Sequence, residues 1–405
     1  MSKNTQQKSN VPQLLLAVDL GGSVTKVFYY DAQGNLKVLA MEPLTADVTE
    51  SEIKNHLQQV VGNPGPEEIA WVKVVDKLTS LRPDEESSGD KTYRVKAVGR
   101  LAKYFGGSAE LRKAKFELGL FKILAAIGVI RIKLHLPPRL TVAVSVLQPW
   151  GEYRNRHQLK EMLADCSNCW VNDERLSINW WHQDFKPEGA GLGMLRGKQL
   201  GANFKKRNTA VLMLGHRNSS ILVFEKGVVQ AGFTSEYGFI ELVKRAHTRI
   251  PCYTIDRLTT TIIDAGLEPS PKVIRRICKT DSPALQAREV SEAIAAITDA
   301  RNQFVKDIAR WINETLADYA VPIDEIVVGG GVADYLKPEL EPRLNTESLW
   351  HLQNLPTNVP DEGLGLRLLD VYGVATFLRD KVEKLAVEKK QQRPSKPQAE
   401  VAQHG

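Results

Sequence analysis

A short segment near the N-terminus constrains the fold more than any other part of the chain. Residues 19–26 read Asp-Leu-Gly-Gly-Ser-Val-Thr-Lys and separate two apolar runs, at 14–19 and 27–30. Two apolar runs around a pair of glycines predict a β-hairpin. A turn at 31–34 and a further apolar run at 36–41 predict a third strand that follows directly.

The chemistry of this predicted hairpin suits a polyphosphate. Gly21 and Gly22 let the backbone approach phosphate oxygens, and the N–H groups of the turn form an anion-binding nest. The remaining turn residues add backbone, hydroxyl or ammonium donors: Ser23, Val24, Thr25 and Lys26. Asp19 ends a buried strand, where a carboxylate is costly without a partner, and a magnesium ion held directly or through its waters is a fitting one. The alternative is an ordinary β-turn with a capping Asp19.

The hairpin has an echo 194 positions further along the chain. The shift places Asp19 on Met213, Gly21 on Gly215, Thr25 on Ser219 and Lys26 on Ser220. Apolar runs at 209–214 and 221–224 flank this second turn. A chain of 405 residues is too long for one simple core. A repeated hairpin therefore predicts two related lobes around a cleft.

Strands and helices alternate along the rest of the chain, which predicts an α/β fold. Further strands are expected at 140–147, 178–185 and 326–328, and helices at 109–130, from Phe239 onward, at 283–319 and at 365–387. The expected organisation is a disordered N-terminus at 1–11, a first lobe at 12–148 with an outer subdomain at about 42–139, a second lobe at 149–360, a return helix at 361–386 that packs on the first lobe, and a disordered tail at 387–405. Residues 80–91 read as a polar surface loop. Basic and apolar residues alternate over 131–139, as in a half-exposed strand that contacts a neighbouring subunit or adaptor.

Composition limits the environment of the protein. The net charge of +6 is a mild excess that permits acidic partners and demands none. Cys166 and Cys169 have metal or redox spacing, but Cys252 and Cys278 offer no second close pair, so we expect reduced thiols. The N-terminal residues lack the apolar stretch of a signal peptide, and the most apolar run, 123–130, is too short to span a membrane. A cytoplasmic protein is expected.

The two hairpins, together with Ile-Val-Val-Gly-Gly-Gly at 326–331, resemble the superfamily of actin, the sugar kinases and the heat-shock chaperone ATPases. That superfamily has two phosphate hairpins, two connecting helices and a glycine-rich adenosine loop. The resemblance implies an actin-like fold, with two related lobes and a nucleotide cleft between them, that binds ATP or GTP with magnesium. It also implies that Gly329, Gly330 and Gly331 lie against the base and ribose. A plain strand-to-helix turn is the alternative for these glycines.

Within the superfamily, the chain most resembles the bacterial ParM/StbA group of plasmid-segregating actins, over roughly residues 14–385. The stretches that carry this resemblance lie at 93–102, 115–125, 144–153 (Val-Ser-Val-Leu-Gln-Pro-Trp-Gly-Glu-Tyr), 187–189 (Pro-Glu-Gly) and 365–373 (Gly-Leu-Arg-Leu-Leu-Asp-Val-Tyr-Gly). The resemblance implies an ATPase that forms filaments of its own chain. It also implies a partner adaptor bound to centromere-like DNA, with no direct DNA contact and no membrane partner.

The resemblance also suggests roles for residues outside the first hairpin. Glu188 occupies the place of the family glutamate that positions the water attacking the terminal phosphate; a solvated residue at a helix start is the alternative. Lys244 matches a helix start that contacts the nucleotide, although a solvated helix face explains it equally well.

The second hairpin departs from the family pattern. Met213 stands where members carry an aspartate that helps to hold magnesium and the attacking water. The expected phosphate contacts of this turn come from the backbone and side chains of Gly215, His216, Arg217, Asn218 and Ser219, with His216 more typical of a surface turn residue. The loss of one carboxylate predicts a slow or atypical ATPase. A small-molecule kinase and a non-polymerising ATPase platform are the alternative functions on the same fold.

Overall fold

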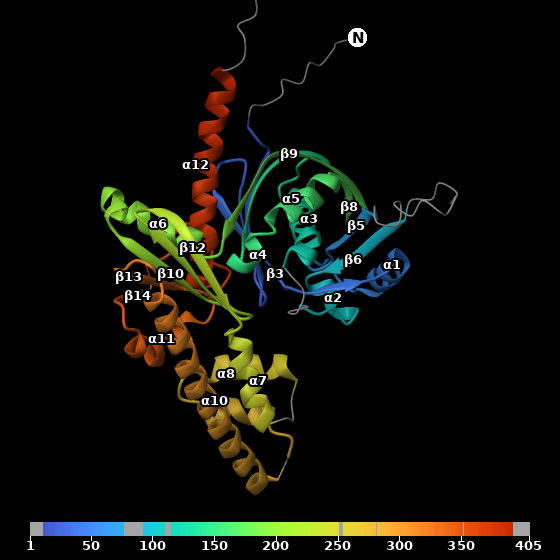
Figure 1. Ribbon diagram of the computed structural model, residues 1–405. Coiled ribbons are helices and arrows are strands. Elements are labelled where there is room, and N and C mark those ends of the chain that lie inside the picture. The colour runs from blue at the N-terminus through green and yellow to red at the C-terminus, as the bar shows by residue number, and fades with distance from the viewer. Residues whose placement is uncertain are drawn as a thin grey trace, which may run out of the picture.

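Two connecting helices lie at the junction of two lobes (Figure 1): α6 (Ala190–Leu200) and α12 (Leu369–Gln391). The computed structural model describes residues 11–76, 92–109, 115–250, 254–280, 282–350 and 352–391. Each connecting helix follows the sheet of one lobe and packs on the sheet of the other: α6 shares a core with Val211 and Val327, and α12 shares one with Ala17 and Phe28. The chain therefore passes between the lobes twice.

The sheet of the first lobe has the strand order β3-β2-β1-β7-β9-β8-β5-β6-β4 within the described residues. Its strands are β1 (Leu14–Leu20), β2 (Thr25–Tyr30), β3 (Leu36–Met41), β4 (Thr45–Asp47), β5 (Trp71–Val75), β6 (Tyr93–Val98), β7 (Arg139–Gln148), β8 (Asn168–Val171) and β9 (Glu174–Pro187). Strand β1 alternates as its sequence predicts: Leu16 and Val18 enter the core under helix α3 (Lys115–Lys133), whereas Ala17 faces α12.

The sheet of the second lobe has the order β12-β11-β10-β13-β14 within the described residues. Its strands are β10 (Asn208–Leu214), β11 (Ser219–Glu225), β12 (Val228–Ser235), β13 (Glu325–Gly329) and β14 (Ser348–Trp350). The run β3-β2-β1-β7-β9 of the first sheet repeats this order and its directions: two antiparallel pairs and then two parallel pairs. The sequence echo is therefore a repeat of a five-stranded unit.

The remaining helices cover the sheets and extend both lobes. They are α1 (Glu50–Gln59), α2 (Arg100–Tyr104), α4 (Trp150–Tyr153), α5 (Arg156–Asp165), α7 (Phe239–Arg249), α8 (Ile255–Ala265), α9 (Pro271–Ile274), α10 (Pro283–Ala317) and α11 (Ala333–Leu340). Helix α10 starts with Pro283 in its first turn, where a missing N–H costs nothing. In Figure 1, α7, α8 and α10 form the far end of the second lobe, and α1 and α2 lie at the far end of the first.

Three expectations from the sequence need correction. The first sheet continues to Pro187 through β8 and β9, so the boundary between the lobes falls well after the expected residue 148. Residues 131–133 end helix α3, and extended structure begins only at Arg139, because the apolar positions of this stretch continue the helix face. Helix α12 continues to Gln391, into the expected disordered tail. The polar loop at 80–91 and the chain ends at 1–10 and 392–405 lie outside the described residues.

Candidate nucleotide-binding site

The two hairpins share one register. Asp19 pairs with Lys26 across β1 and β2, and Met213 pairs with Ser220 across β10 and β11. Each partner in the second hairpin lies 194 positions after its counterpart in the first, as the sequence echo requires. A side chain at Gly21 would place its Cβ 2.4 Å from the Val24 carbonyl oxygen, and one at Gly215 would lie 2.6 Å from the Asn218 carbonyl oxygen. Both turns therefore need a glycine at the same point.

The charged residues of the first hairpin satisfy each other. The Lys26 ammonium donates to the Asp19 carboxylate, and both side chains are almost fully buried. Lys26 also donates to the backbone carbonyl of Arg367, with its Nζ 3.2 Å from that oxygen. The sequence suggested magnesium as the partner that a buried Asp19 needs, whereas the structure shows a lysine in contact with this carboxylate. The ammonium is thus held between the Asp19 carboxylate and the Arg367 carbonyl.

The polar side chains of the second hairpin have structural partners. The Ser219 hydroxyl donates to the Tyr237 carbonyl at 2.6 Å. An Arg217 nitrogen lies 3.2 Å from a carboxylate oxygen of Glu152, on helix α4 of the first lobe. These contacts differ from the phosphate contacts that we expected from Ser219 and Arg217. The second hairpin would therefore contact a phosphate more through its backbone than through its side chains.

The start of helix α7 forms hydrogen bonds with the second turn. The N–H groups of Phe239 and Ile240 donate to the carbonyls of Gly215 and His216, at 3.1 and 2.9 Å. The first N–H groups of a helix usually need such acceptors. Lys244, further along α7, is exposed and pairs with Glu241. The structure thus places Lys244 on a solvated helix face and outside the pocket described next.

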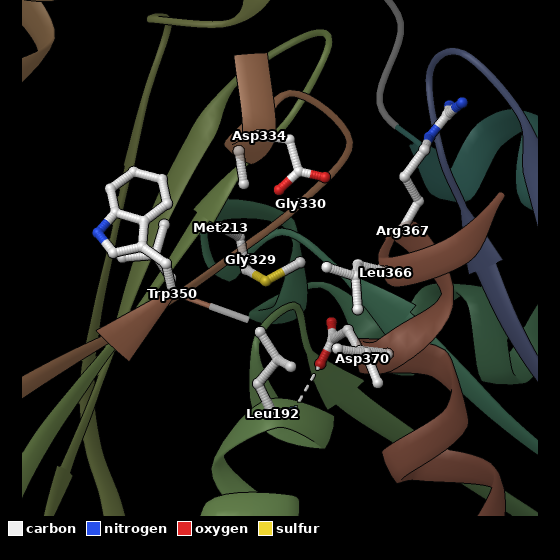
Figure 2. Close-up of a pocket in the computed structure, with 12 residues that line it drawn as sticks. Leu192, Met213, Gly329, Gly330, Asp334, Trp350, Leu366, Arg367 and Asp370 are labelled. Atoms are coloured by element: carbon white, nitrogen blue, oxygen red, sulfur yellow. Dashed lines mark hydrogen bonds between the residues drawn. The ribbon is translucent and has the colours of Figure 1, made fainter. Parts of the chain in front are cut away.

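A pocket between the glycine loop and α12 contains the echo residue Met213 (Figure 2). Its lining residues are Leu192, Met213, Val328, Gly329, Gly330, Ala333, Asp334, Trp350, Leu366, Arg367, Leu369 and Asp370. Gly330 has a φ of 111°, and a Cβ there would lie 2.3 Å from the Leu214 carbonyl oxygen. The loop thus lies flat against the end of β10, and only glycine fits at this position. The contact with a base or ribose that the resemblance implies for this loop stays a prediction.

Asp370 is a buried carboxylate that the sequence analysis did not assign to the site. Its two oxygens accept the N–H groups of Gly189 and Leu192, at 2.8 and 3.2 Å, and so cap the start of α6. Burial raises the pKa of Asp370 to about 7, and the negative charges of Asp19 and Glu188 add to this effect. An aspartate at the start of an otherwise apolar helix segment is the sequence signal that could have revealed it.

Glu188 lies between the end of β9 and the start of α6. Its N–H donates to the Gln148 carbonyl at 2.7 Å, which ties it to the end of the neighbouring strand β7. Both Glu188 and Asp19 raise the pKa of Asp370, so the structure brings the two predicted catalytic carboxylates into one electrostatic environment. The role of Glu188 in positioning a water stays a prediction.

Arg367 is the second residue that the sequence analysis left unassigned. It lies in the 3₁₀ turn Gly365–Leu368 that leads into α12, and its guanidinium donates to the Ser23 hydroxyl at 3.1 Å. Burial lowers its pKa, and the nearby Asp19 carboxylate opposes this effect. Burial also lowers the pKa of His216, and the positive charge of Arg367 contributes to that shift. His216 is half-buried, whereas the sequence favoured a surface turn residue.

The side chains available as metal ligands limit the kind of metal site that the described residues can form. Among the described residues no group of three or more His, Cys, Asp or Glu side chains could hold an ion. Asp19 alone fits the expected magnesium, which would need waters and nucleotide phosphates as its other ligands. Cys166, Cys169 and Cys278 are reduced thiols, and burial raises the pKa of Cys169 to about 12, which does not suit a redox centre. Cys252 lies outside the described residues.

Solved structures identify the fold. The chain is similar to a ParM from Clostridium botulinum in a 15-stranded filament, with 13% identity, a TM-score of 0.56, and 91% of this chain and 99% of that chain covered. A Bacillus thuringiensis ParM with ATP gives 16% identity, a TM-score of 0.55, and coverage of 91% and 99%. The fold is actin-like, of the ParM type. The archaeal actin homologue Ta0583 is also similar, at 13% identity with a TM-score of 0.52 and the same coverage.

These similarities confirm the predicted α/β fold with two related lobes and the resemblance to the ParM group. At 13% to 16% identity they establish the fold alone. No protein-family model and no curated protein sequence matches the chain. Among the described residues no helix combines the length and apolarity needed to cross a membrane.

Proposed function

We propose that this protein is a nucleotide-dependent, filament-forming actin homologue. It binds ATP or GTP with magnesium between its two hairpins, assembles head to tail in the cytoplasm, and disassembles after slow hydrolysis. The observation that carries this proposal is the pair of hairpins in identical register, 194 positions apart, beside a glycine loop that lies flat on β10. A cleft built from two phosphate-type turns and a flat glycine loop suits a nucleoside triphosphate.

The similar structures support the assembly part of the proposal. One of them is a ParM filament and another is the Alp12 filament, and Bacillus thuringiensis ParM has been solved with ATP and with ADP. Head-to-tail contacts that do not close into a ring generate filaments. By resemblance to the ParM/StbA group, the filament would segregate plasmid DNA through an adaptor bound to centromere-like DNA. A cytoskeletal, cell-shape role would need no adaptor of this kind.

Sedimentation combined with negative-stain microscopy tests the filament directly. We expect the protein to pellet as filaments at micromolar concentration with ATP or GTP and magnesium, and to stay in the supernatant without nucleotide. The same samples, supplied with a sugar, test the kinase alternative. Absence of pelleting under all conditions, with phosphate transferred to the sugar, would refute the filament proposal.

Of the two carboxylates that line the pocket, Asp334 and Asp370, the second does not suit the kinase alternative. A catalytic aspartate has to reach a substrate hydroxyl. Asp370 is buried, and both of its oxygens already accept backbone N–H groups of α6. No observation on the described residues favours this alternative over the filament.

Slow hydrolysis follows from Met213. This side chain lines the pocket where the echo of Asp19 would stand, and its sulfur lies near Gly329 and Leu192 in an apolar setting. A carboxylate there would orient water and metal, so Met213→Asp should raise the rate of phosphate release about 10-fold, which corresponds to about 1.4 kcal/mol of the barrier. Met213→Asn is the matched control, because asparagine has a similar size to aspartate but no charge. It should not accelerate phosphate release. Wild-type turnover as fast as that of Met213→Asp would contradict the prediction.

A further inference from the structure

Arg367 is placed among three parts of the cleft. Its guanidinium donates to Ser23 in the first hairpin, and its Nε lies 3.3 Å from where a Cβ of Gly331 would stand in the glycine loop. Its charge also lowers the pKa of His216 in the second hairpin. Arg367 itself belongs to the segment that returns from the second lobe into α12. In Figure 2 its side chain points away from Asp370, toward the strands of the first lobe.

The Arg367 guanidinium has a nitrogen that is not used in a hydrogen bond among the described residues. Its Nε is buried and makes no hydrogen bond to any described residue. The hydroxyl of Ser23 is a weak, neutral partner for an arginine, whose forked donors match phosphate and carboxylate oxygens much better. A buried cationic donor without an anion costs free energy. The nearby Asp19 carboxylate is already paired with Lys26, so a further anion beside Arg367 would stabilise this donor.

The charges beside the first hairpin also favour an anion. Lys26 and Arg367 are positive and Asp19 is negative there, whereas the Glu188 carboxylate acts on Asp370 and Asp334 lines the pocket. Met213 adds no negative charge from the opposite hairpin. In a cleft of this kind the cations can neutralise part of a polyphosphate.

We propose that Arg367 is a phosphate-binding residue, which contacts the phosphate chain of a bound nucleotide between the two hairpins. This inference rests on the proposed nucleotide binding and adds a residue from the return segment to the two hairpins. Because Arg367 lies two residues before the start of α12, a contact with phosphate also ties the connecting helix to the ligand. Nucleotide binding then acts on the segment that joins the lobes.

Calorimetric titration with adenosine, ADP and ATP separates a phosphate contact from a structural role. Charge-assisted hydrogen bonds to phosphate predict that Arg367→Gln weakens ADP and ATP binding by about 10- to 100-fold, with adenosine affinity changed by less than about 2-fold. Arg367→Lys retains the charge without the fork and should lose less affinity than Arg367→Gln. Arg379→Gln, on the exposed face of α12, is the matched control and should bind all three ligands like the wild type.

The possible outcomes separate a phosphate contact of Arg367 from a structural role of this residue and from a failure of nucleotide binding itself. If Arg367→Gln weakens adenosine as strongly as ADP, Arg367 supports the pocket and does not bind phosphate, and the inference is overturned. Unchanged ADP and ATP affinity in Arg367→Gln, with a folded variant by circular dichroism, also overturns it. If the wild-type protein itself binds no nucleotide, the proposed function fails, which is a different result from the failure of Arg367 alone.

Discussion

Asp370 joins the two connecting helices through a single carboxylate. It belongs to the first turn of α12 and accepts the N–H groups of Gly189 and Leu192 at the start of α6. An ionised carboxylate suits these donors, but its complete burial and the negative charges of Asp19 and Glu188 favour the protonated form. The pKa of about 7 therefore makes the junction of the helices sensitive to pH near neutrality.

The stability of the protein should reflect this pKa. The folded protein holds the Asp370 proton up to about pH 7, whereas the unfolded chain releases it near its model value of 3.8. The folded state thus binds more protons between these values, so the contribution of Asp370 to the free energy of unfolding falls as pH rises and levels off above pH 7. Asp370→Asn removes the charge and should flatten this decline, by about 2 kcal/mol or more, because one pKa unit corresponds to about 1.4 kcal/mol.

Urea unfolding between pH 4 and 8 gives the free energy of unfolding of the wild type and of Asp370→Asn at each pH. In the difference between the two proteins, the contributions of the other titrating groups cancel. Asp264→Asn, at an exposed position on α8, is the control and should follow the wild-type curve. Parallel curves for Asp370→Asn and wild type would show that Asp370 does not titrate in this range.

Sequence reasoning found the residues whose partners are near them in the chain. Asp19 and Lys26 are separated by seven positions, so a hairpin pattern was enough to place them together. Arg367 and Ser23 are separated by 344 positions, and Asp370 and Gly189 by 181. No local pattern encodes such contacts, because they depend on how the two lobes and the connecting helices pack. The partner of Arg217, Glu152 in the first lobe, was missed for the same reason.

At the scale of elements, the crossing of α6 and α12 depends on two glycines. A Cβ at Gly191 would lie 1.8 Å from the Asp370 carbonyl oxygen, and one at Gly373 would lie 2.3 Å from the Gly191 carbonyl oxygen. The backbones of the two helices are therefore in direct contact. Small residues at a helix crossing permit such an approach, and any side chain has to separate the helices.

Gly191→Ala should thus separate the connecting helices. The atoms in the way belong to the backbone and cannot rotate aside, so we expect a loss of about 3 kcal/mol or more in the free energy of unfolding, as for severe overpacking. Gly151→Ala in α4 is the matched control, because its nearest atom would be Thr234 Cβ at 3.8 Å, an ordinary contact. Chemical denaturation of both variants checks the prediction, and equal stabilities would contradict the crossing geometry.

Elements were predicted well where the period of the apolar residues was clear. Strand β3 was predicted with its observed bounds, and β1, β7 and β13 within one residue at each end. The stretch 131–139 was misread because alternating basic and apolar residues also fit the last turn of α3 and the connection to β7. The lobe boundary was misplaced because β9 returns to pair with β7, and pairing partners cannot be read from periodicity.

At the scale of the whole molecule, helix α4 connects the first lobe to the second sheet. It follows β7 directly, and the N–H of Gly151 donates to the Thr234 hydroxyl of β12 at 3.2 Å. The ring of Trp150 lies against Gly232 on the same strand, where a Cβ would come within 2.3 Å. The ion pair between Glu152 and Arg217 belongs to this contact. The relative position of the lobes thus depends on α4 as well as on the connecting helices.

Reversing a charge in the Glu152–Arg217 ion pair should change the relative position of the two lobes. Both side chains are mostly buried, so Glu152→Arg would place two cations about 3.2 Å apart and push the hairpin away from α4. We expect a larger radius of gyration by small-angle X-ray scattering and about 5-fold weaker nucleotide binding, because the second hairpin leaves its place in the cleft. The double exchange Glu152→Arg with Arg217→Glu restores the attraction and should recover most of both values.

A control pair within one lobe separates this effect from a general loss of stability. Arg245 and Asp307 join α7 to α10, 2.8 Å apart, with similar exposure and both in the second lobe. Asp307→Arg should lower the free energy of unfolding but leave the radius of gyration and the nucleotide affinity of the folded protein unchanged. If Asp307→Arg expands the molecule as much as Glu152→Arg does, the effect is not specific to the contact between the lobes. If the double exchange fails to recover binding while Glu152→Arg alone weakens it, Arg217 acts on the nucleotide directly, as the sequence first suggested.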